Sequence, residues 1–238
     1  MYRAIFISDI HLGSSFNKSK QIFELLEHIE SEKIFLVGDI INTSAPSDHP
    51  DIIRFITILQ SKPWEIIYIS GNHEDDRKLP PISMDFNKRV FSKEREIYIN
   101  SHNSIYIEHG HSFHHSGIFN RTIKVLSVYW RSIVRYKNRN RDKNRNINNL
   151  NIKTKPKKKT FYYRILKPVA QKLLISSFRY YMGSLAKKSS CDVVICGHFH
   201  LPEDRTIKGI RYINCGDWIE NSSFVVEEMS GELLLKTL

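Results

Sequence analysis

The amino-acid sequence predicts an α/β protein, a class that some schemes would name α+β, with a basic helical insertion. Short apolar runs alternate with amphipathic helical segments over the first 70 residues, whereas the C-terminal part contains strand-like runs only. Residues 117–190 fit neither pattern. The chain has 238 residues, of which 41% are hydrophobic. A chain of this length buries roughly 70% of the surface that its unfolded form exposes, so it needs no disulfide to hold a core.

Strands and helices alternate through the first part of the chain. Three apolar runs that end at polar residues are typical of buried strands: residues 2–8, 33–37 and 64–70. Apolar side chains at helical spacing predict two helices between them: residues 20–32 and 51–60. Pro50 suits the first position of the second helix, with Asp48 as a candidate cap. This alternation predicts parallel crossover units.

Further strands follow an irregular stretch around Pro80 and Pro81. They are predicted at residues 96–100, 104–108, 192–196, 205–207, 210–214, 224–228 and 232–236. Turn signals at Lys208-Gly209 and Ser230-Gly231 separate pairs of these strands. The C-terminal part is therefore expected to contain strands without helices.

The positive charge of the chain is concentrated in residues 117–190. This stretch contains 20 Lys and Arg residues against one acidic residue, Asp142, and the rest holds 16 basic and 24 acidic residues, which together give the net charge of +11. We expect helices over 118–136 and 161–185, joined by a mobile, polar linker at 137–159. The predicted division is a core of residues 1–116 and 191–238, and an inserted basic cap of residues 117–190.

The sequence favours a cytoplasmic protein. No apolar run approaches the ~20 residues of a membrane-spanning helix. The first apolar run reaches the carboxylate of Asp9 too soon for a signal peptide. Cys191, Cys196 and Cys215 form an odd set without a CxxC motif, which predicts reduced, buried thiols. Peripheral association with the inner face of the cytoplasmic membrane is compatible with these features.

Five polar clusters follow strand-like runs. They are Asp9-Ile10-His11, Gly38-Asp39, Gly71-Asn72-His73, His109-Gly110-His111 and Gly197-His198-Phe199-His200. A single histidine or aspartate in such a place is usually structural or a helix cap, but capping alone does not account for five clusters. The carboxyl ends of parallel strands meet at one edge of a sheet. Oxygen and imidazole ligands without thiolate favour manganese, iron or zinc, and the glycines let the backbone come close to an ion.

The order DxH, GD, GNH, HGH and GHxH resembles that of the calcineurin-like metallophosphoesterases. The resemblance covers both ends of the chain outside the insertion and implies a four-layer α-β-β-α sandwich with two divalent ions. Manganese is the expected metal, with iron and zinc as alternatives. The implied metal ligands are Asp9, His11 and His200 for one ion, and Asn72, His109 and His198 for the other, with Asp39 as the bridge. His73 is implied as the catalytic residue beside the scissile phosphate.

Two C-terminal stretches resemble a narrower branch, the UDP-2,3-diacylglucosamine pyrophosphatases. They are Gly197-His198-Phe199-His200-Leu201-Pro202 and Asn214-Cys215-Gly216-Asp217-Trp218-Ile219-Glu220-Asn221. That branch also carries a basic helical insertion, and the resemblance implies release of UMP and an acylated sugar phosphate from a lipid-linked nucleotide in lipid A synthesis. The chain departs from the branch after Asp39, where GDxxDxW is usual, and at His111, where aspartate is common. His111 is expected to orient a ligand, and the roles of His114 and His115 stay open.

The basic insertion has three interpretations. Aromatic and basic side chains on the same helices favour contact with an anionic membrane surface or with acyl chains. A helical cap with a solvated basic face and a nucleic-acid-binding surface are the alternatives. For the whole chain, a broader phosphodiesterase or phosphatase acting on another lipid-linked or nucleic-acid phosphate is the second hypothesis. A non-catalytic scaffold is the third, and it is disfavoured because all seven ligand positions and His73 are present. The sequence leaves the oligomeric state open.

Overall fold

The computed structural model describes residues 1–15, 17–42, 44–46, 48–73, 90–124, 126 and 167–238. The chain divides into two compact units. The core unit comprises Met1–His111 and Met182–Leu238, and the inserted unit comprises Ser112–Tyr181. The predicted boundaries at residues 117 and 190 stay a prediction. The predicted linker 137–159, most of the predicted helix 118–136 and the start of the predicted helix 161–185 lie outside the described residues.

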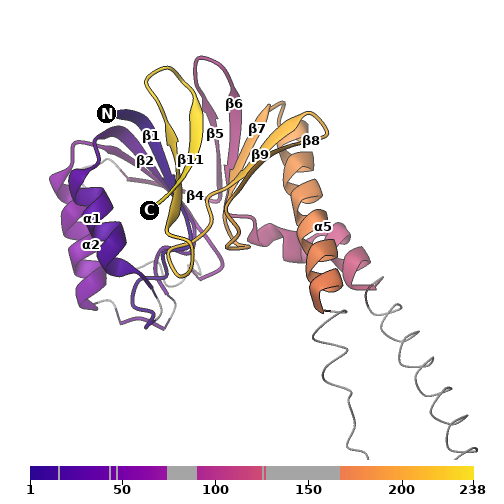
Figure 1. Ribbon diagram of the computed structural model, residues 1–238, viewed down its shortest axis with the longest axis horizontal. Coiled ribbons are helices and arrows are strands. Elements are labelled where there is room, and N and C mark those ends of the chain that lie inside the picture. The colour runs from indigo at the N-terminus through magenta and orange to yellow at the C-terminus, as the bar shows by residue number, and fades with distance from the viewer. Residues whose placement is uncertain (16, 43, 47, 74–89, 125, 127–166) are drawn as a thin grey trace, which may run out of the picture. The chain divides into compact units, whose positions relative to one another are not determined.

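The strands of the core unit form two sheets (Figure 1). The first sheet has the order β11-β10-β1-β2-β3-β4. Its strands are β1 (Tyr2–Ile7), β2 (Ser31–Val37), β3 (Glu65–Ile69), β4 (Val90–Lys93), β10 (Ser223–Glu227) and β11 (Leu233–Thr237). The second sheet has the order β5-β6-β7-β9-β8. Its strands are β5 (Arg95–Ile99), β6 (Ser104–Glu108), β7 (Val193–Cys196), β8 (Glu203–Ile207) and β9 (Ile210–Asn214).

The predicted parallel crossovers are confirmed in the first sheet. Strands β1 and β2 pair in parallel, as do β2 and β3, and the connections contain α1 (Ser19–His28) and α2 (Pro50–Ser61). Apolar side chains of one face of this sheet pack with those of the two helices in a single buried cluster that includes Ile5, Ile22 and Trp64. Strands of a parallel sheet that is covered on both faces are apolar at every position, which accounts for the continuous apolar runs of β1, β2 and β3.

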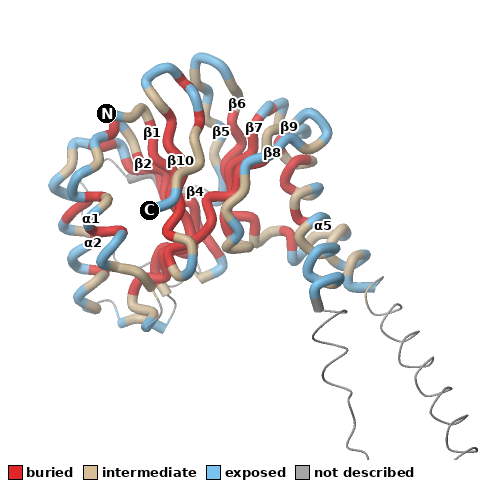
Figure 2. Tube along the Cα trace, in the orientation of Figure 1, coloured by how far each residue is buried: buried red, intermediate tan, exposed pale blue. Residues whose placement is uncertain are grey.

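The two sheets face each other over a second apolar cluster. Phe35 and Ile67 of the first sheet belong to the same cluster as Ile105 and Val193 of the second. Phe6 and Phe35 stack in this layer with ring centroids 4.7 Å apart. Figure 2 shows that burial is concentrated along the strands, whereas the turns are exposed.

The second sheet is also buried on its other face. Tyr106, Val194 and Tyr212 alternate with the residues of the inter-sheet cluster and are almost fully buried. The helix α5 (Lys167–Lys188) contributes its last turns to the core unit, where Met182 and Ala186 are fully buried. The core unit is thus the four-layer α-β-β-α sandwich that the sequence predicted.

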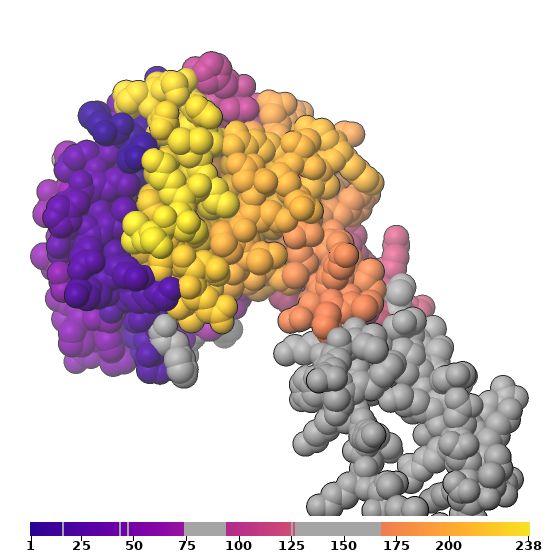
Figure 3. Space-filling view, in the orientation of Figure 1, coloured from indigo at the N-terminus to yellow at the C-terminus, as the bar shows by residue number. Residues whose placement is uncertain are grey.

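The two ends of the chain lie together in the core unit. Strand β1 pairs with β10, and β10 pairs with β11. The space-filling view accordingly shows C-terminal residues beside N-terminal ones on the same surface (Figure 3). None of the helices in the described ranges has the length and hydropathy that a membrane crossing requires.

Several predicted details of the secondary structure are wrong. The helix predicted over 20–32 ends at His28, because Ile29 is extended and Ser31 already pairs with Tyr2 in the sheet. His49, not Asp48, caps α2 by accepting a hydrogen bond from the Asp51 N–H at 3.2 Å. Strand β4 was missed, since four residues directly before another strand carry little periodic signal.

The predicted turns and buried thiols are confirmed. Gly209 and Gly231 have φ angles of 85° and 91° in the turns between strand pairs, a conformation in which glycine pays no steric penalty. Cys191, Cys196 and Cys215 are free and buried.

Candidate metal centre

The loops that follow β1, β2, β3, β6 and β7 bring the predicted site residues together. Three groups have one possible ligand atom per residue within 4.8 Å of one another: Asp9, His11 and His200; His11, Asp39 and His73; and Asp39, His109 and His198. Six of the seven predicted ligands and His73 belong to these groups. The seventh, Asn72, is exposed beside His73, and its role as a ligand stays a prediction.

Two carboxylates are central to these groups. Asp9 Oδ1 lies 3.1 Å from His200 Nε2 and 3.8 Å from His11 Nε2. Asp39 Oδ2 lies 3.4 Å from His109 Nε2, 3.9 Å from His73 Nε2 and 4.0 Å from His11 Nε2. Asp39 therefore contacts histidines of both predicted ligand sets, which is the position that a bridging ligand requires.

The backbone of the site is strained. Five predicted ligands have positive φ angles between 51° and 71°: Asp9, His11, Asp39, His198 and His200. Such a conformation costs a non-glycine residue about 1–3 kcal/mol and persists only where the surroundings hold it. Backbone hydrogen bonds hold it here, from Asp9 N to Gly38 O and from His11 N to Asp39 O, both at 3.0 Å.

Glycines are required where one loop packs on another. A Cβ at Gly71 would collide with the Asp39 carboxylate, and a Cβ at Gly197 would collide with Ser8 and the Asp9 carboxylate. A Cβ at Gly38 would overlap the His109 ring. These glycines therefore let the ligand side chains of neighbouring loops approach one another.

Hydrogen bonds orient two of the histidines. His109 Nδ1 lies 2.9 Å from the carbonyl oxygen of Val37, so that Nε2 faces Asp39. His200 Nδ1 lies 3.0 Å from Asp217 Oδ2, so that Nε2 faces Asp9. One ring nitrogen held by an oxygen while the other points into the site is the usual arrangement of a metal-binding histidine.

Charges in the site are coupled. Burial disfavours the imidazolium form of His109, but the carboxylates of Asp9 and Asp39 outweigh this effect and raise its pKa to about 9. Burial also opposes the charge on His200, whose pKa the carboxylates of Asp217 and Asp9 raise to about 10. Burial would raise the pKa values of Asp9 and Asp39, yet the neighbouring histidines keep both low. The raised pKa values of His109 and His200 and the lowered ones of Asp9 and Asp39 show that these groups stabilise one another's charges.

A comparison with protein families identifies the chain. Residues 2–202 match the calcineurin-like phosphoesterase family. The chain belongs to this family. It is therefore a metal-dependent phosphoester hydrolase, and its family implies divalent metal ions.

Solved structures resemble this phosphoesterase at low sequence identity, and one of those named here has a TM-score above 0.5. A novel archaeal phosphodiesterase has a TM-score of 0.53 and 14% identity, with 99% of each chain covered. A single mutant of Vps29 from Entamoeba histolytica has a TM-score of 0.48 and 12% identity, covering 99% of this chain and 97% of the other. A predicted phosphoesterase from Streptococcus pneumoniae has a TM-score of 0.38 and 14% identity, covering 100% and 98%. No curated protein matches the sequence.

The residues of the phosphoesterase site fit divalent ions. Asp9 Oδ1, His11 Nε2 and His109 Nε2 are buried and make no hydrogen bond within the described part of the chain. Buried polar atoms are rarely left in this state. Carboxylate oxygens and imidazole nitrogens without thiolate suit manganese, iron or zinc.

Two residues that support the site, Ser8 and Asp217, were not predicted to do so. Ser8 is buried, and its hydroxyl lies within hydrogen-bond distance of the Val37 carbonyl, at 2.7 Å, and of the Asp9 carboxylate, either of which can accept its one proton. Asp217 orients His200, and its place after β9 in a Gly-Asp pair was the available signal. The position of Ser8 directly before Asp9 was the corresponding signal for the first loop.

Three further histidines lie near the end of β6. The His111 ring is 5.8 Å from that of His109, centroid to centroid, which is compatible with its predicted role beside a ligand. It begins a short 3₁₀ helix, η1 (His111–His115), in which His114 and His115 are exposed. None of the three belongs to the groups of possible ligands among the described residues.

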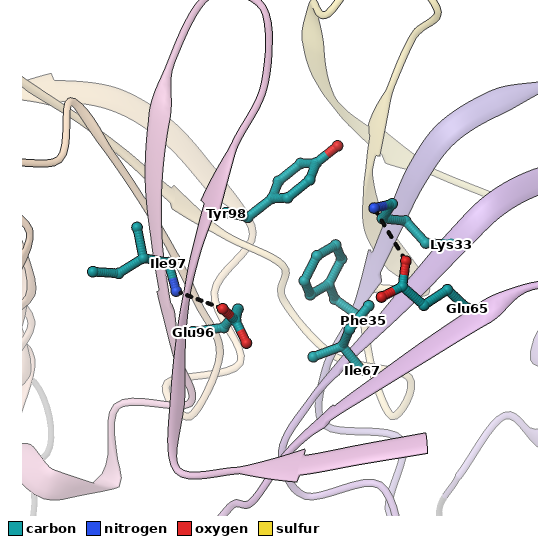
Figure 4. Close-up of a pocket in the computed structure, with 7 residues that line it drawn as sticks. All are labelled: Lys33, Phe35, Glu65, Ile67, Glu96, Ile97 and Tyr98. Atoms are coloured by element: carbon teal, nitrogen blue, oxygen red, sulfur yellow. Dashed lines mark hydrogen bonds and ion pairs between the residues drawn. The ribbon is translucent and has the colours of Figure 1, made fainter. Parts of the chain in front are cut away.

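A separate cleft of about 210 Å³ lies between the two sheets. Its lining residues come from β2, β3 and β5: Lys33, Phe35, Glu65, Ile67, Glu96, Ile97 and Tyr98 (Figure 4). Lys33 pairs with Glu65 at 3.2 Å and lies over the Tyr98 ring. None of the predicted site residues lines this cleft, so it is distinct from the candidate metal centre.

Proposed function

We propose that this phosphoesterase hydrolyses the pyrophosphate of a lipid-linked nucleotide such as UDP-2,3-diacylglucosamine, which gives UMP and an acylated sugar 1-phosphate. The observation that carries the proposal is the pair of stretches at 197–202 and 214–221, which resemble the UDP-2,3-diacylglucosamine pyrophosphatases. Their contact with each other supports it. Asp217 accepts from His200 Nδ1 at 3.0 Å, and Asn221 Nδ2 donates to the His200 carbonyl at 2.9 Å.

In this proposal seven residues hold two divalent ions. Asp9, His11 and His200 bind one ion, Asn72, His109 and His198 bind the other, and Asp39 bridges them. Such ions, with manganese as the first choice and iron or zinc as alternatives, would supply hydroxide near neutral pH and would neutralise charge on the phosphate. The proximity of Asp39 Oδ2 to both His11 and His109 supports its bridging role.

His73 is the proposed catalytic residue. Its side chain is 35% exposed, whereas that of His109 is fully buried, so a substrate can reach His73 from solvent. The backbone N–H of His73 donates to Asp39 Oδ1 at 2.9 Å. The His73 ring meets the His11 ring edge-on, with 4.7 Å between centroids. We assign to it the stabilisation or protonation of the leaving oxygen. The imidazole of His73 also lies near Asp39, so His73 could instead be a metal ligand. The metal content of a His73 variant distinguishes the two roles.

The inserted unit is the proposed site of lipid contact. Phe113 packs against Phe119, Phe178 and Tyr181 with ring centroids 5.3 to 5.6 Å apart, which forms a small aromatic core within this unit. Among its described residues, four apolar side chains are instead exposed: Ile123, Val169, Leu173 and Tyr180. Exposed apolar groups beside basic ones suit an anionic membrane surface at the inner face of the cytoplasmic membrane.

The second candidate function is hydrolysis of a nucleic-acid phosphodiester. The charge of residues 117–190, with 20 basic residues against one acidic residue, favours this alternative. Basic residues without apolar neighbours would bind a phosphate backbone in a salt-dependent manner. The exposed apolar side chains are the reason for preferring lipid.

A substrate comparison tests the proposal. Purified protein with Mn²⁺ is incubated with UDP-2,3-diacylglucosamine, a UDP-sugar without acyl chains, bis-p-nitrophenyl phosphate and single-stranded nucleic acid. The expected result is release of UMP, fastest from the diacylated substrate and absent with EDTA. Equal rates on both UDP-sugars would contradict the lipid assignment, and cleavage of nucleic acid alone would favour the second candidate.

A further inference from the structure

Asn214 joins two loops behind the candidate metal centre. It is the last residue of β9 and is fully buried. Its side-chain Nδ2 donates to the carbonyl oxygen of Gly197 at 2.8 Å, and its Oδ1 accepts from the N–H of Gly216 at 2.9 Å. One amide group therefore connects the loop after β7 with the loop after β9.

The first of these loops carries two predicted ligands in strained conformations. His198 and His200 have φ angles of 71° and 54°. The peptide of Gly197 is held on both sides, because its N–H donates to the His109 carbonyl at 3.1 Å and its own carbonyl accepts from Asn214. Directly after it, the His198 N–H donates to Asp9 Oδ2 at 2.9 Å. The Asn214 bond thus fixes the point at which the loop turns toward the site.

The second loop carries the carboxylate that orients His200. Gly216, which the Asn214 oxygen holds, has a φ angle of 77° and precedes Asp217. Asp217 Oδ2 contacts His200 Nδ1, and Asp217 Oδ1 accepts from the backbone N–H of Asn221 at 2.8 Å. The distance between His200 and its orienting carboxylate depends on how the two loops are joined.

We infer that Asn214 is a positioning residue that sets the affinity of the site for metal ions. It keeps His198 and His200 in place before an ion binds, so that ion binding does not have to order the loop. The inference rests on the proposed roles of these two histidines. An amide can join the two loops because it offers a donor to the Gly197 carbonyl and an acceptor to the Gly216 N–H. Aspartate would place a carboxylate oxygen against the Gly197 carbonyl.

A purely structural role makes a different prediction. Asn214 Nδ2 also lies 3.2 Å from the Tyr212 hydroxyl and 3.7 Å from Cys196 Sγ, in the buried layer of the second sheet. If Asn214 only provided hydrogen bonds to the buried polar groups of this layer, its substitution would lower stability without changing metal affinity. Metal affinity is therefore the readout that separates the two roles.

Asn100 provides a matched control. Its Oδ1 accepts from the N–H groups of His102 and Asn103 at 2.9 and 2.7 Å, and its Nδ2 donates to the Gly231 carbonyl at 3.3 Å. This side chain also joins two turns, but it precedes β6, whereas His109 follows the other end of that strand. Asn100→Asp thus makes the same chemical change away from the metal centre.

The test compares Asn214→Asp and Asn100→Asp in the full chain with wild type. Calorimetric titration of the metal-free proteins with Mn²⁺ is expected to show about 10- to 100-fold weaker binding for Asn214→Asp, the usual effect of losing a residue that orients metal ligands. Asn100→Asp should bind like wild type. Hydrogen exchange in metal-free Asn214→Asp should be faster over residues 197–201. Wild-type affinity for Mn²⁺ in Asn214→Asp would overturn the inference, whatever its exchange rates.

A second variant, Asn214→Ser, tests the inference if Asn214→Asp folds poorly. Asn214→Ser introduces no charge and is too short to reach the Gly197 carbonyl, so it should give the same two changes. Neither readout uses a substrate. A wild-type protein that binds Mn²⁺ without cleaving a lipid-linked pyrophosphate would contradict the proposed substrate only. If wild type binds no Mn²⁺, the inference that Asn214 sets metal affinity fails together with the ligand assignments.

Discussion

The candidate metal centre and the inserted unit use charge in opposite ways. At the centre, Asp9 and Asp39 are buried and each lies within 4 Å of histidine nitrogens. In the inserted unit, Arg121, Lys124 and Lys172 are exposed, and Arg179 is half-buried. Buried charges interact strongly and hold fixed positions, whereas exposed charges of one sign are screened and attract a polyanion without a fixed geometry. Substitutions should therefore abolish chemistry in the first region and alter only association in the second.

The largest effect is expected at the bridging carboxylate. Asp39→Asn removes the charge that lies between His11, His73 and His109, so one or both ions should be lost. Activity should fall by more than about 100-fold, the upper range seen for residues that merely orient ligands. Metal analysis of the purified variant and its rate on bis-p-nitrophenyl phosphate measure both quantities.

Asp204→Asn is the control for this variant. Asp204 forms an ion pair with Arg211 at 2.7 Å away from the centre, and its loss should leave metal content and rate unchanged. Full activity of Asp39→Asn with two ions bound would show that this carboxylate does not bridge them.

A smaller effect is expected at His73. His73→Ala should keep metal content near that of wild type and lower turnover by about 10²–10⁴-fold, the range for a general acid or base. The side chain of His73 is 35% exposed, whereas that of the predicted ligand His109 is buried, and this difference is why we assign His73 to catalysis and not to metal binding. Loss of metal from His73→Ala would instead make this residue a ligand.

The coupled charges predict how stability depends on pH. In the metal-free protein the pKa values of His109 and His200 are raised from 6.5 to about 9 and about 10. A raised pKa means that the folded form holds the proton more tightly, so its contribution to stability is complete below pH 6.5. It is lost as the pH rises through these values. The melting temperature with EDTA should fall by a few degrees between about pH 7 and pH 10.

Saturating Mn²⁺ should reverse this trend. Ions compete with the same protons, so metal affinity should rise over this pH range. A metal-free melting temperature that rises toward pH 10 would contradict the pairing of protonated histidines with Asp9 and Asp39.

The smallest effect on hydrolysis is expected in the insertion. Deletion of residues 137–159 removes ten of the 20 basic residues of the stretch and none of the predicted ligands. Hydrolysis of bis-p-nitrophenyl phosphate should stay near the wild-type rate. Binding to anionic liposomes should weaken, since each basic residue near such a surface contributes about 1 kcal/mol. Unchanged liposome binding, measured by sedimentation at low salt, would make the insertion a structural cap.

The sequence alone located the site because its signal is local. An apolar run predicts a strand, and the polar residues that end it must lie at the carboxyl edge of the sheet. Thus the clusters at Asp9, Asp39, His109 and His198 could be assigned to one place without knowing which strands are neighbours. The parallel pairing of β1, β2 and β3 was predictable for the same reason.

Only the tertiary structure decided which residues support these ligands. The end of α1 at His28 depends on the pairing of Ser31 with Tyr2, which no helical pattern contains. Asn214 bonds a glycine 17 positions away, and the His198 N–H bonds a carboxylate 189 positions away. These contacts depend on how the loops of two sheets meet in space. A periodic pattern describes the neighbours along one strand or helix, and hydrogen bonds between loops have no such period.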